Sequence, residues 1–302
     1  MSVILAYIGV IVIWSTTPLA IQWSSDGWGY LFGVSARMVI GAIFCLIVLT
    51  VIKQKLAWHK DAILTYLAAS IGIYGAMLCV YWGAQFIPSG LVAVLFGLSP
   101  IVTSVFATVW LKESNLTIGR VSATLLGLLG VVIIFNVDIG MDNLALKGVI
   151  ALLMAVFLHS GSAIWVKRIG ADLPALSVTG GSLLLAASMY ILTWLVFGDM
   201  DLKMSDVQLK AGLALGYLSI LGSVLGFTLY FYVLKKMDVS KVALVTLVTP
   251  VLALILGRLL NNESLPLTVL LGSACIITAL VLHQWGDIFI MRIRQGKTLP
   301  QL

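Results

Sequence analysis

Residues 92–114, VAVLFGLSPIVTSVFATVWLKES, and residues 242–264, VALVTLVTPVLALILGRLLNNES, align without a gap at an offset of 150 positions. Each copy is an apolar run with a proline near its middle, Pro100 or Pro250, and each ends on Glu-Ser. An apolar run of about 20 residues is typical of a helix that crosses a membrane. The repeat therefore predicts a membrane protein built from two related halves.

The composition indicates that lipid covers much of the molecular surface. Of the 302 residues, 61% are hydrophobic and 10% are charged, whereas a soluble domain has about 45–50% apolar and about 25% charged residues. So few charges exclude a soluble enzyme, a disordered protein and a nucleic-acid-binding module. The net charge of +6 is better explained by basic cytoplasmic loops than by nucleic acid as a partner.

Ten continuous apolar runs are each long enough to cross a bilayer core of about 30 Å as a helix. We therefore expect an all-α polytopic membrane protein with ten transmembrane helices, arranged as two inverted five-helix repeats. Residues 1–138 would form the first repeat, and residues 139–302 the second, with a short cytoplasmic tail. The expected spans are 3–22, 30–52, 62–85, 89–111, 117–137, 146–166, 173–197, 208–232, 239–260 and 265–286.

Lysine and arginine residues predict how the chain lies in the membrane. With the N-terminus inside, 13 of the 18 basic residues fall in inner loops or the C-terminal tail, 4 fall in outer loops, and Arg37 lies within a span. This asymmetry follows the positive-inside rule and places both termini in the cytoplasm. Because five is an odd number, the second half enters the membrane from the opposite side. Inverted repeats of this kind form transporters with a site near the midplane.

Several motifs resemble those of EamA-type transporters in the drug/metabolite transporter superfamily. They are WSTTP at 14–18, ARMVIGA at 36–42, the two proline-containing runs with their glutamates, and LLGLLGVVII at 125–134. The resemblance implies a ten-helix secondary transporter, an exporter or exchanger of small metabolites such as amino acids or amphipathic compounds. It also implies alternating access in an inner or plasma membrane. One departure is His159, which stands where the second repeat of the family usually has tryptophan.

Ionisable side chains inside spans are candidates for function, because they are costly to place in a membrane. His159 lies near the middle of 146–166, where it would either change charge during transport or form a neutral hydrogen bond. Arg37 would either support the bundle, which we favour, or hold an anionic substrate. Because no acidic residue lies in a span interior, we expect a facilitator, an exchanger, or coupling through another group.

Polar and aromatic side chains should face the inside of the bundle, because polar groups in lipid would lack partners. Large amphipathic rings can hold a partly apolar ligand and still form one hydrogen bond. A structural or gating role is expected for Arg37, Pro100 and Pro250. The residues expected to contact substrate are Trp14, Tyr74, Tyr81, Gln85, His159, Ser223 and Tyr230.

Two alternatives stay open at this point. An intramembrane enzyme acting on a lipid-linked substrate would rely on His159 with Ser160 or Ser162, although no carboxylate orients the histidine. Glycines spaced four apart in 208–232 permit a close helix contact, either within the chain or in a homodimer. We expect a small-molecule substrate and membrane lipids as partners. We expect no nucleic acid, no cofactor and no bound metal.

Overall fold

The computed structural model describes residues 2–111, 117–135, 143–198, 209–237, 242, 245–264 and 266–294, and every regular element within them is a helix. The first half contains α1 (Val3–Ser25), α2 (Tyr30–Val51), α3 (Lys60–Ser70), η1 (Ile71–Ala76), α4 (Met77–Gly83), α5 (Ser89–Phe96), α6 (Ser99–Leu111) and α7 (Ile118–Phe135). The second half contains α8 (Asn143–Ile169), α9 (Ala175–Phe197), α10 (Leu209–Tyr217), η3 (Leu218–Leu225), α11 (Gly226–Lys236), α13 (Val245–Asn261) and α14 (Leu267–Arg294).

The helices confirm the prediction of an all-α polytopic membrane protein. In the described part of the chain, 7 helices are long and apolar enough to cross a membrane, some of them joining two or three labelled segments. Shorter apolar helices at 119–134, 248–261 and 267–283 occupy the fifth, ninth and tenth expected positions. Every expected span thus coincides with an apolar helix in the described residues.

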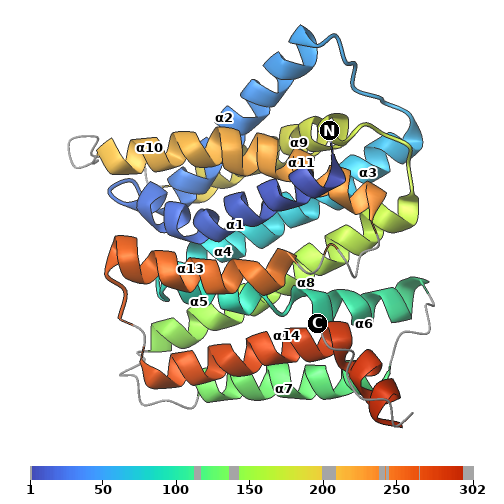
Figure 1. Ribbon diagram of the computed structural model, residues 1–302. Coiled ribbons are helices and arrows are strands. Elements are labelled where there is room, and N and C mark those ends of the chain that lie inside the picture. The colour runs from blue at the N-terminus through green and yellow to red at the C-terminus, as the bar shows by residue number, and fades with distance from the viewer. Residues whose placement is uncertain are drawn as a thin grey trace.

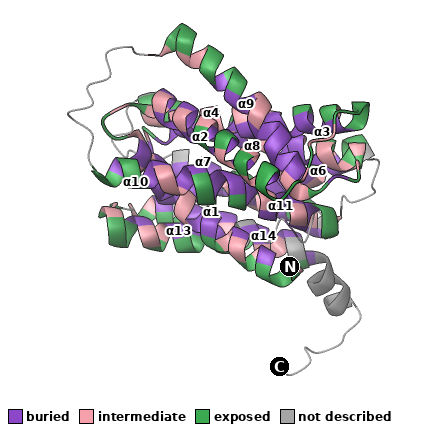
Figure 2. Cartoon of the chain, turned by 90° about the horizontal axis from the view of Figure 1, so that it is seen from above, coloured by how far each residue is buried: buried purple, intermediate pink, exposed green. Residues whose placement is uncertain are grey.

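Apolar side chains cover the outside of the bundle as well as its core. Along α1, Ile4, Leu5 and Ile8 are exposed, and along α7, Leu125 and Leu128 are exposed. Figure 2 shows buried residues gathered in the middle of the bundle and exposed ones at its periphery. A large apolar outer surface would be unfavourable in water and is favourable against lipid chains.

The two halves are interlocked rather than side by side. Helix α1, the first span of the first half, packs against α10, α11 and α13 of the second half. Helix α8, the first span of the second half, packs in the same way against α3, α4 and α6 of the first half. Helices α2 and α9 pack together, and α7 pairs with α14 at the opposite edge of the bundle (Figure 1). Each half therefore folds around the first span of the other.

Three spans are interrupted near their middle. The π-helical segments η1 and η3 interrupt the third and eighth spans. A turn at 97–98 separates α5 from α6 in the fourth span. Pro100 is the second residue of α6, where the missing N–H of proline costs little. Pro250 instead lies within α13, so the two prolines related by the repeat occupy different local structures.

Two glycines bring the backbones of α7 and α14 into contact. A Cβ atom on Gly130 would lie 2.7 Å from the carbonyl oxygen of Gly272, and one on Gly272 would lie 2.7 Å from the carbonyl oxygen of Gly130. Any side chain larger than hydrogen at either position would push the two helices apart. Small residues at such contacts let transmembrane helices approach closely and gain dispersion energy.

The glycine contact predicts that Gly130→Ala destabilises the protein by about 1–3 kcal/mol, the usual cost of overpacking a tight contact. The measurement is thermal unfolding of the purified protein in detergent. Gly212→Ala on α10 is the matched control, because a Cβ atom there meets nothing within 4 Å. The close contact between α7 and α14 is contradicted if Gly130→Ala unfolds at or above the wild-type temperature.

Candidate functional site

A central cavity of about 70 Å³ lies between the two halves. Side chains from the first, second, third, fourth, sixth, eighth and ninth spans form its walls. Both halves therefore contribute to it, as expected for a site between two repeats. The lining residues are Trp14, Thr17, Pro18, Ile21, Arg37, Met77, Val80, Val92, Ala93, Phe96, His159, Gly222, Phe227 and Thr249.

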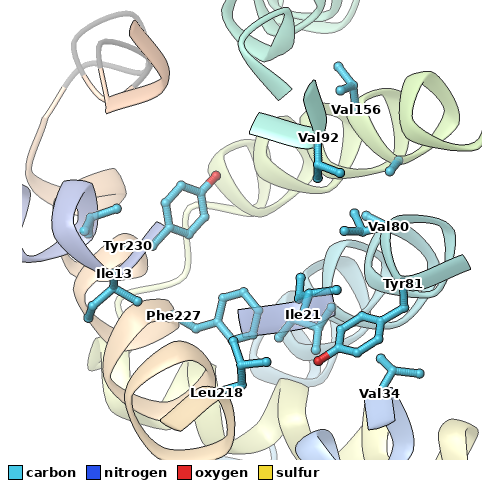
Figure 3. Packing of buried hydrophobic residues seen from close by; sticks show 14 of the residues in the cluster. Ile13, Ile21, Val34, Val80, Tyr81, Val92, Val156, Leu218, Phe227 and Tyr230 are labelled. Carbon is cyan, nitrogen blue, oxygen red and sulfur yellow. The ribbon is translucent and has the colours of Figure 1, made fainter. Parts of the chain in front are cut away.

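Aromatic rings border one side of the cavity. The ring of His159 lies 5.8 Å from Trp14, 5.5 Å from Tyr230 and 5.9 Å from Phe96, measured between centroids. Trp14 and Tyr230 are themselves 5.1 Å apart. Figure 3 shows Tyr230 and Phe227 projecting from α11 toward the interior, with Ile21 and Val80 on facing helices. Trp14 and His159, from the first span of each half, thus meet in one aromatic cluster.

Arg37 places a cation in the cavity wall. Its side chain is 1% exposed, and its Nε donates a hydrogen bond to the Ser223 hydroxyl at 2.9 Å. Its guanidinium carbon lies 5.9 Å from the centroid of the Tyr81 ring. The buried Nη1 donates to no acceptor among the described residues. The cavity therefore combines an apolar interior with one incompletely bonded guanidinium.

The structure brings some of the predicted site residues together and separates others. Trp14, His159 and Arg37 line the cavity, and Tyr230 borders it through its ring contacts. Ser223 lies behind the cavity wall, where it holds Arg37.

Two residues expected to contact substrate lie elsewhere in the bundle. Tyr74 bonds Thr193 at 2.7 Å and packs on Tyr190, which places it between the third and seventh spans. Gln85 is exposed and bonds the Trp82 carbonyl. Neither of them lines the central cavity, and Tyr81, which was also expected to contact substrate, contacts Arg37 without lining the cavity itself.

The interruptions in the spans are held by side chains from the other half. The buried Tyr190 hydroxyl of α9 lies within bonding distance of the Tyr74 carbonyl in η1, at 2.7 Å. Arg37 of α2 holds Ser223 in η3. The Ser160 hydroxyl of α8 donates to the Ser99 carbonyl, next to the turn at 97–98, at 3.3 Å. These bonds fix the irregular backbone that surrounds the cavity.

The serines beside His159 are engaged with the backbone. Ser160 donates to Ser99 as described, and the Ser162 hydroxyl donates to the Ala68 carbonyl at 2.7 Å. A serine nucleophile would instead need its hydroxyl bonded to a general base. The geometry therefore gives no support to the alternative of an intramembrane enzyme built on His159.

A polar network joins the halves at the end of the bundle where α1 ends, here called the distal end. Glu263, after α13, accepts hydrogen bonds from the Ser89 backbone N–H at 3.1 Å and the Ser89 hydroxyl at 2.6 Å. It also accepts one from the Gly90 N–H at 3.3 Å. Its carboxylate thereby caps the N-terminus of α5, where the helix dipole favours negative charge. Glu113, its counterpart in the repeat, lies outside the described residues.

Asn261 extends this contact to the first span. Its side-chain amide donates to Glu263 at 3.1 Å and to the Gln22 side chain at 3.2 Å. It accepts a bond from the Trp23 indole N–H at 3.0 Å. We call Gln22, Trp23, Ser89, Asn261 and Glu263 the distal network. In this network, α1 and α5 of the first half bond the end of α13 in the second half. The distal network therefore joins the two halves.

Two further hollows lie toward the ends of the bundle, and ring contacts connect their walls with the wall of the central cavity. The distal hollow, about 370 Å³, is lined by Tyr81, which contacts Arg37 of the cavity. The hollow at the opposite, proximal end is about 220 Å³ and is lined by Phe231. The Phe231 ring lies 5.4 Å from that of Tyr230, which borders the cavity. The central cavity therefore has a neighbouring hollow on the distal side and another on the proximal side.

The proximal hollow carries charge at its rim. Lys235 pairs with Asp172, and Lys167 donates to the Leu234 and Met237 carbonyls at 3.0 Å. Lys235 holds the pKa of the Asp172 carboxyl below its ordinary value through a hydrogen bond and its charge. These exposed contacts bind the loop after α8 to the end of α11.

Comparison with known proteins agrees with this architecture. The EamA-like transporter family model matches residues 1–136 and again residues 146–283. The uncharacterized transporter YoaV of Bacillus subtilis is 24% identical over 283 residues, which cover 93% of this chain and 96% of that protein. The uncharacterized inner membrane transporter YedA of Escherichia coli is 25% identical over 288 residues, covering 93% and 90%. A solved crystal structure with 18% identity superposes with a TM-score of 0.70 over 97% of this chain and 98% of that one.

Proposed function

The chain belongs to the EamA-like transporter family, and we propose that it is a secondary transporter that moves small organic metabolites by alternating access through the central cavity. The observation that carries the proposal is the position of that cavity. It lies between interlocked halves, with a further hollow toward each end of the bundle. Rocking of one half against the other would open the cavity toward each hollow in turn.

The lining of the cavity suggests the kind of substrate. Trp14, Phe96 and Phe227 offer apolar surface, whereas Arg37, His159 and Thr249 offer polar groups. This combination suits amino acids or amphipathic compounds with one apolar body and one polar end. The substrate is therefore a small molecule with both characters, and surrounding lipid solvates the outer faces of the helices.

The charges in the described residues favour a facilitator, an exchanger, or coupling through a group other than a carboxylate. Asp26, Asp61, Asp172 and Glu263 lie at the ends of spans, and in the described part of the chain no carboxylate lines the cavity. A carboxylate inside the membrane is a common carrier of coupling protons. Here His159 would be the group in the cavity best suited to such a role.

The distribution of basic residues supports a cytoplasmic location for the proximal end and an outer location for the distal end. The proximal end carries Lys167, Lys235 and Lys236, as cytoplasmic loops do. Both termini would then be cytoplasmic, and the distal network would close the cavity on the outer side of an inner or plasma membrane. We also propose that residues 1–138 and 139–302 form the two five-helix repeats, and that two copies of the chain can pair as a homodimer.

Transport into liposomes tests the proposal. With purified protein, at least one of a panel of radiolabelled apolar amino acids, their amides and the matching carboxylic acids should accumulate unchanged in protein-containing liposomes. Trp14→Ala should slow this accumulation about tenfold, since loss of a ring contact worth about 1.4 kcal/mol changes an equilibrium tenfold. Trp165→Ala, at an exposed position on α8, is the control and should leave the rate unchanged.

Two outcomes speak against a transporter that uses this cavity. One is recovery of a chemically altered product from the liposomes, which would favour the enzyme alternative. The other is equal transport by wild-type protein and Trp14→Ala.

The distal network predicts that Glu263→Gln opens the outer side more often. Loss of about 1 kcal/mol of charge-assisted hydrogen bonding should raise the open population about fivefold. A Thr17→Cys probe in the cavity, in a background without Cys45, Cys79 and Cys275, should then react about fivefold faster with an impermeant maleimide added outside.

Asp26→Asn is the matched control, because Asp26 is a distal carboxylate outside the network. Burial raises the pKa of Asp26, and Lys210 opposes that rise. A gating role for Glu263 is rejected if labelling is unchanged in Glu263→Gln, or if Asp26→Asn accelerates it equally.

A further inference from the structure

Arg37 is a buried cation with an unused donor at the wall of the central cavity. Its side chain is 1% exposed, it lines the cavity, and its Nη1 has no acceptor among the described residues. Among the described residues, the ion pair that forms joins Lys235 and Asp172, which lie at the proximal end and not at Arg37. No described carboxylate therefore neutralises Arg37.

A buried guanidinium without an anion is energetically costly. Removing a charge from water costs several kcal/mol, and the cost is offset only when an opposite charge and full hydrogen bonding replace the lost hydration. The Ser223 hydroxyl satisfies Nε, and the face of the Tyr81 ring provides a weak cation–π contact at 5.9 Å. These contacts orient Arg37 but supply no negative charge.

The same contacts fix the guanidinium in place for a ligand. Ser223 engages Nε on one edge of the planar group, which leaves the Nη edge free for a planar anion. A Cβ atom at Gly222 would lie 3.3 Å from Nη2 of Arg37. Glycine at this position therefore leaves space for the guanidinium. Arginine recognises a carboxylate through two parallel N–H···O bonds, a geometry that a fixed guanidinium favours.

Resting on the proposed function, we infer that Arg37 binds the carboxylate of the transported molecule, a small monocarboxylate with an apolar or aromatic body. The rest of the cavity supplies the matching apolar surface through Trp14, Phe96 and Phe227. A dianion would bring a second negative charge, and the described lining residues offer no second arginine or lysine to balance it. His159 is packed among the rings of the aromatic cluster. Loading with substrate thus neutralises Arg37, and the empty cavity keeps an uncompensated charge.

The test compares 3-phenylpropionate with 3-phenylpropionamide, which has nearly the same shape and no charge. Binding of each to the full-length protein in nanodiscs is measured by isothermal titration calorimetry. We expect the acid to bind wild-type protein at least 30-fold more tightly than the amide, a difference of about 2 kcal/mol. Ser223→Ala, which releases Nε, should reduce this preference several-fold while leaving amide binding unchanged.

Arg37→Met should abolish the preference for the acid, and Arg258→Met should retain it. Arg258 is the matched control because it is an exposed arginine on α13. Equal affinity of wild-type protein for acid and amide overturns the inference, and so does a preference that survives in Arg37→Met. If Arg37→Met does not fold, the wild-type comparison and Ser223→Ala decide the question.

The outcomes also separate this inference from the proposed function. Equal binding of acid and amide, with both weakened by Trp14→Ala, overturns the role of Arg37 and leaves transport through the cavity in place. Loss of transport in Trp14→Ala together with a 30-fold preference for the acid supports both.

Discussion

A bilayer core offers no water to a backbone group that loses its helical partner, so each break in a transmembrane helix must be met by another part of the protein. In η1 and beside the turn at 97–98, that partner comes from the opposite half. Tyr190 donates to the Tyr74 carbonyl of η1, and Ser160 donates to the Ser99 carbonyl before Pro100. At η3, Arg37 of the opposite half bonds the side chain of Ser223. The breaks that surround the cavity are therefore also the points at which the halves hold each other.

This arrangement explains why the central cavity and the interlocked packing occur together. Helices α1 and α8 each insert into the opposite half, and Trp14 and His159 meet where those two helices approach. A change in the angle between the halves would alter the aromatic cluster and the distal network together. In the proposed transport cycle, the contacts that form the site and those that would close it therefore both lie between the halves.

The sequence predicted the spans because lipid imposes length and hydropathy on every crossing helix. It also predicted Trp14 and His159 as site residues, and both line the cavity, since a large ring or an ionisable group inside a span has few favourable alternatives. Arg37 was expected to support the bundle, and it lines the cavity as well. Phe96 and Phe227 were missed, because an apolar ring in a span has the same pattern whether it faces lipid or a cavity. Tyr74 and Gln85 were grouped with Tyr81 by helical periodicity, but Tyr74 lies within the π turns of η1 and Gln85 lies in the turn after α4, where that periodicity does not hold.

The most direct measurement is a reversible cross-link across the distal network. Gln22 and Asn261 come from different halves, and their side chains bond at 3.2 Å. Cysteines at both positions, in a chain without its three native cysteines, would be joined by a short bis-methanethiosulfonate reagent that spans the gap left by the two side chains and fixes the halves in the closed arrangement. Cross-linking should stop transport in liposomes and reduction should restore it, with each single cysteine unaffected. Transport that continues at full rate through the cross-linked protein would contradict this prediction.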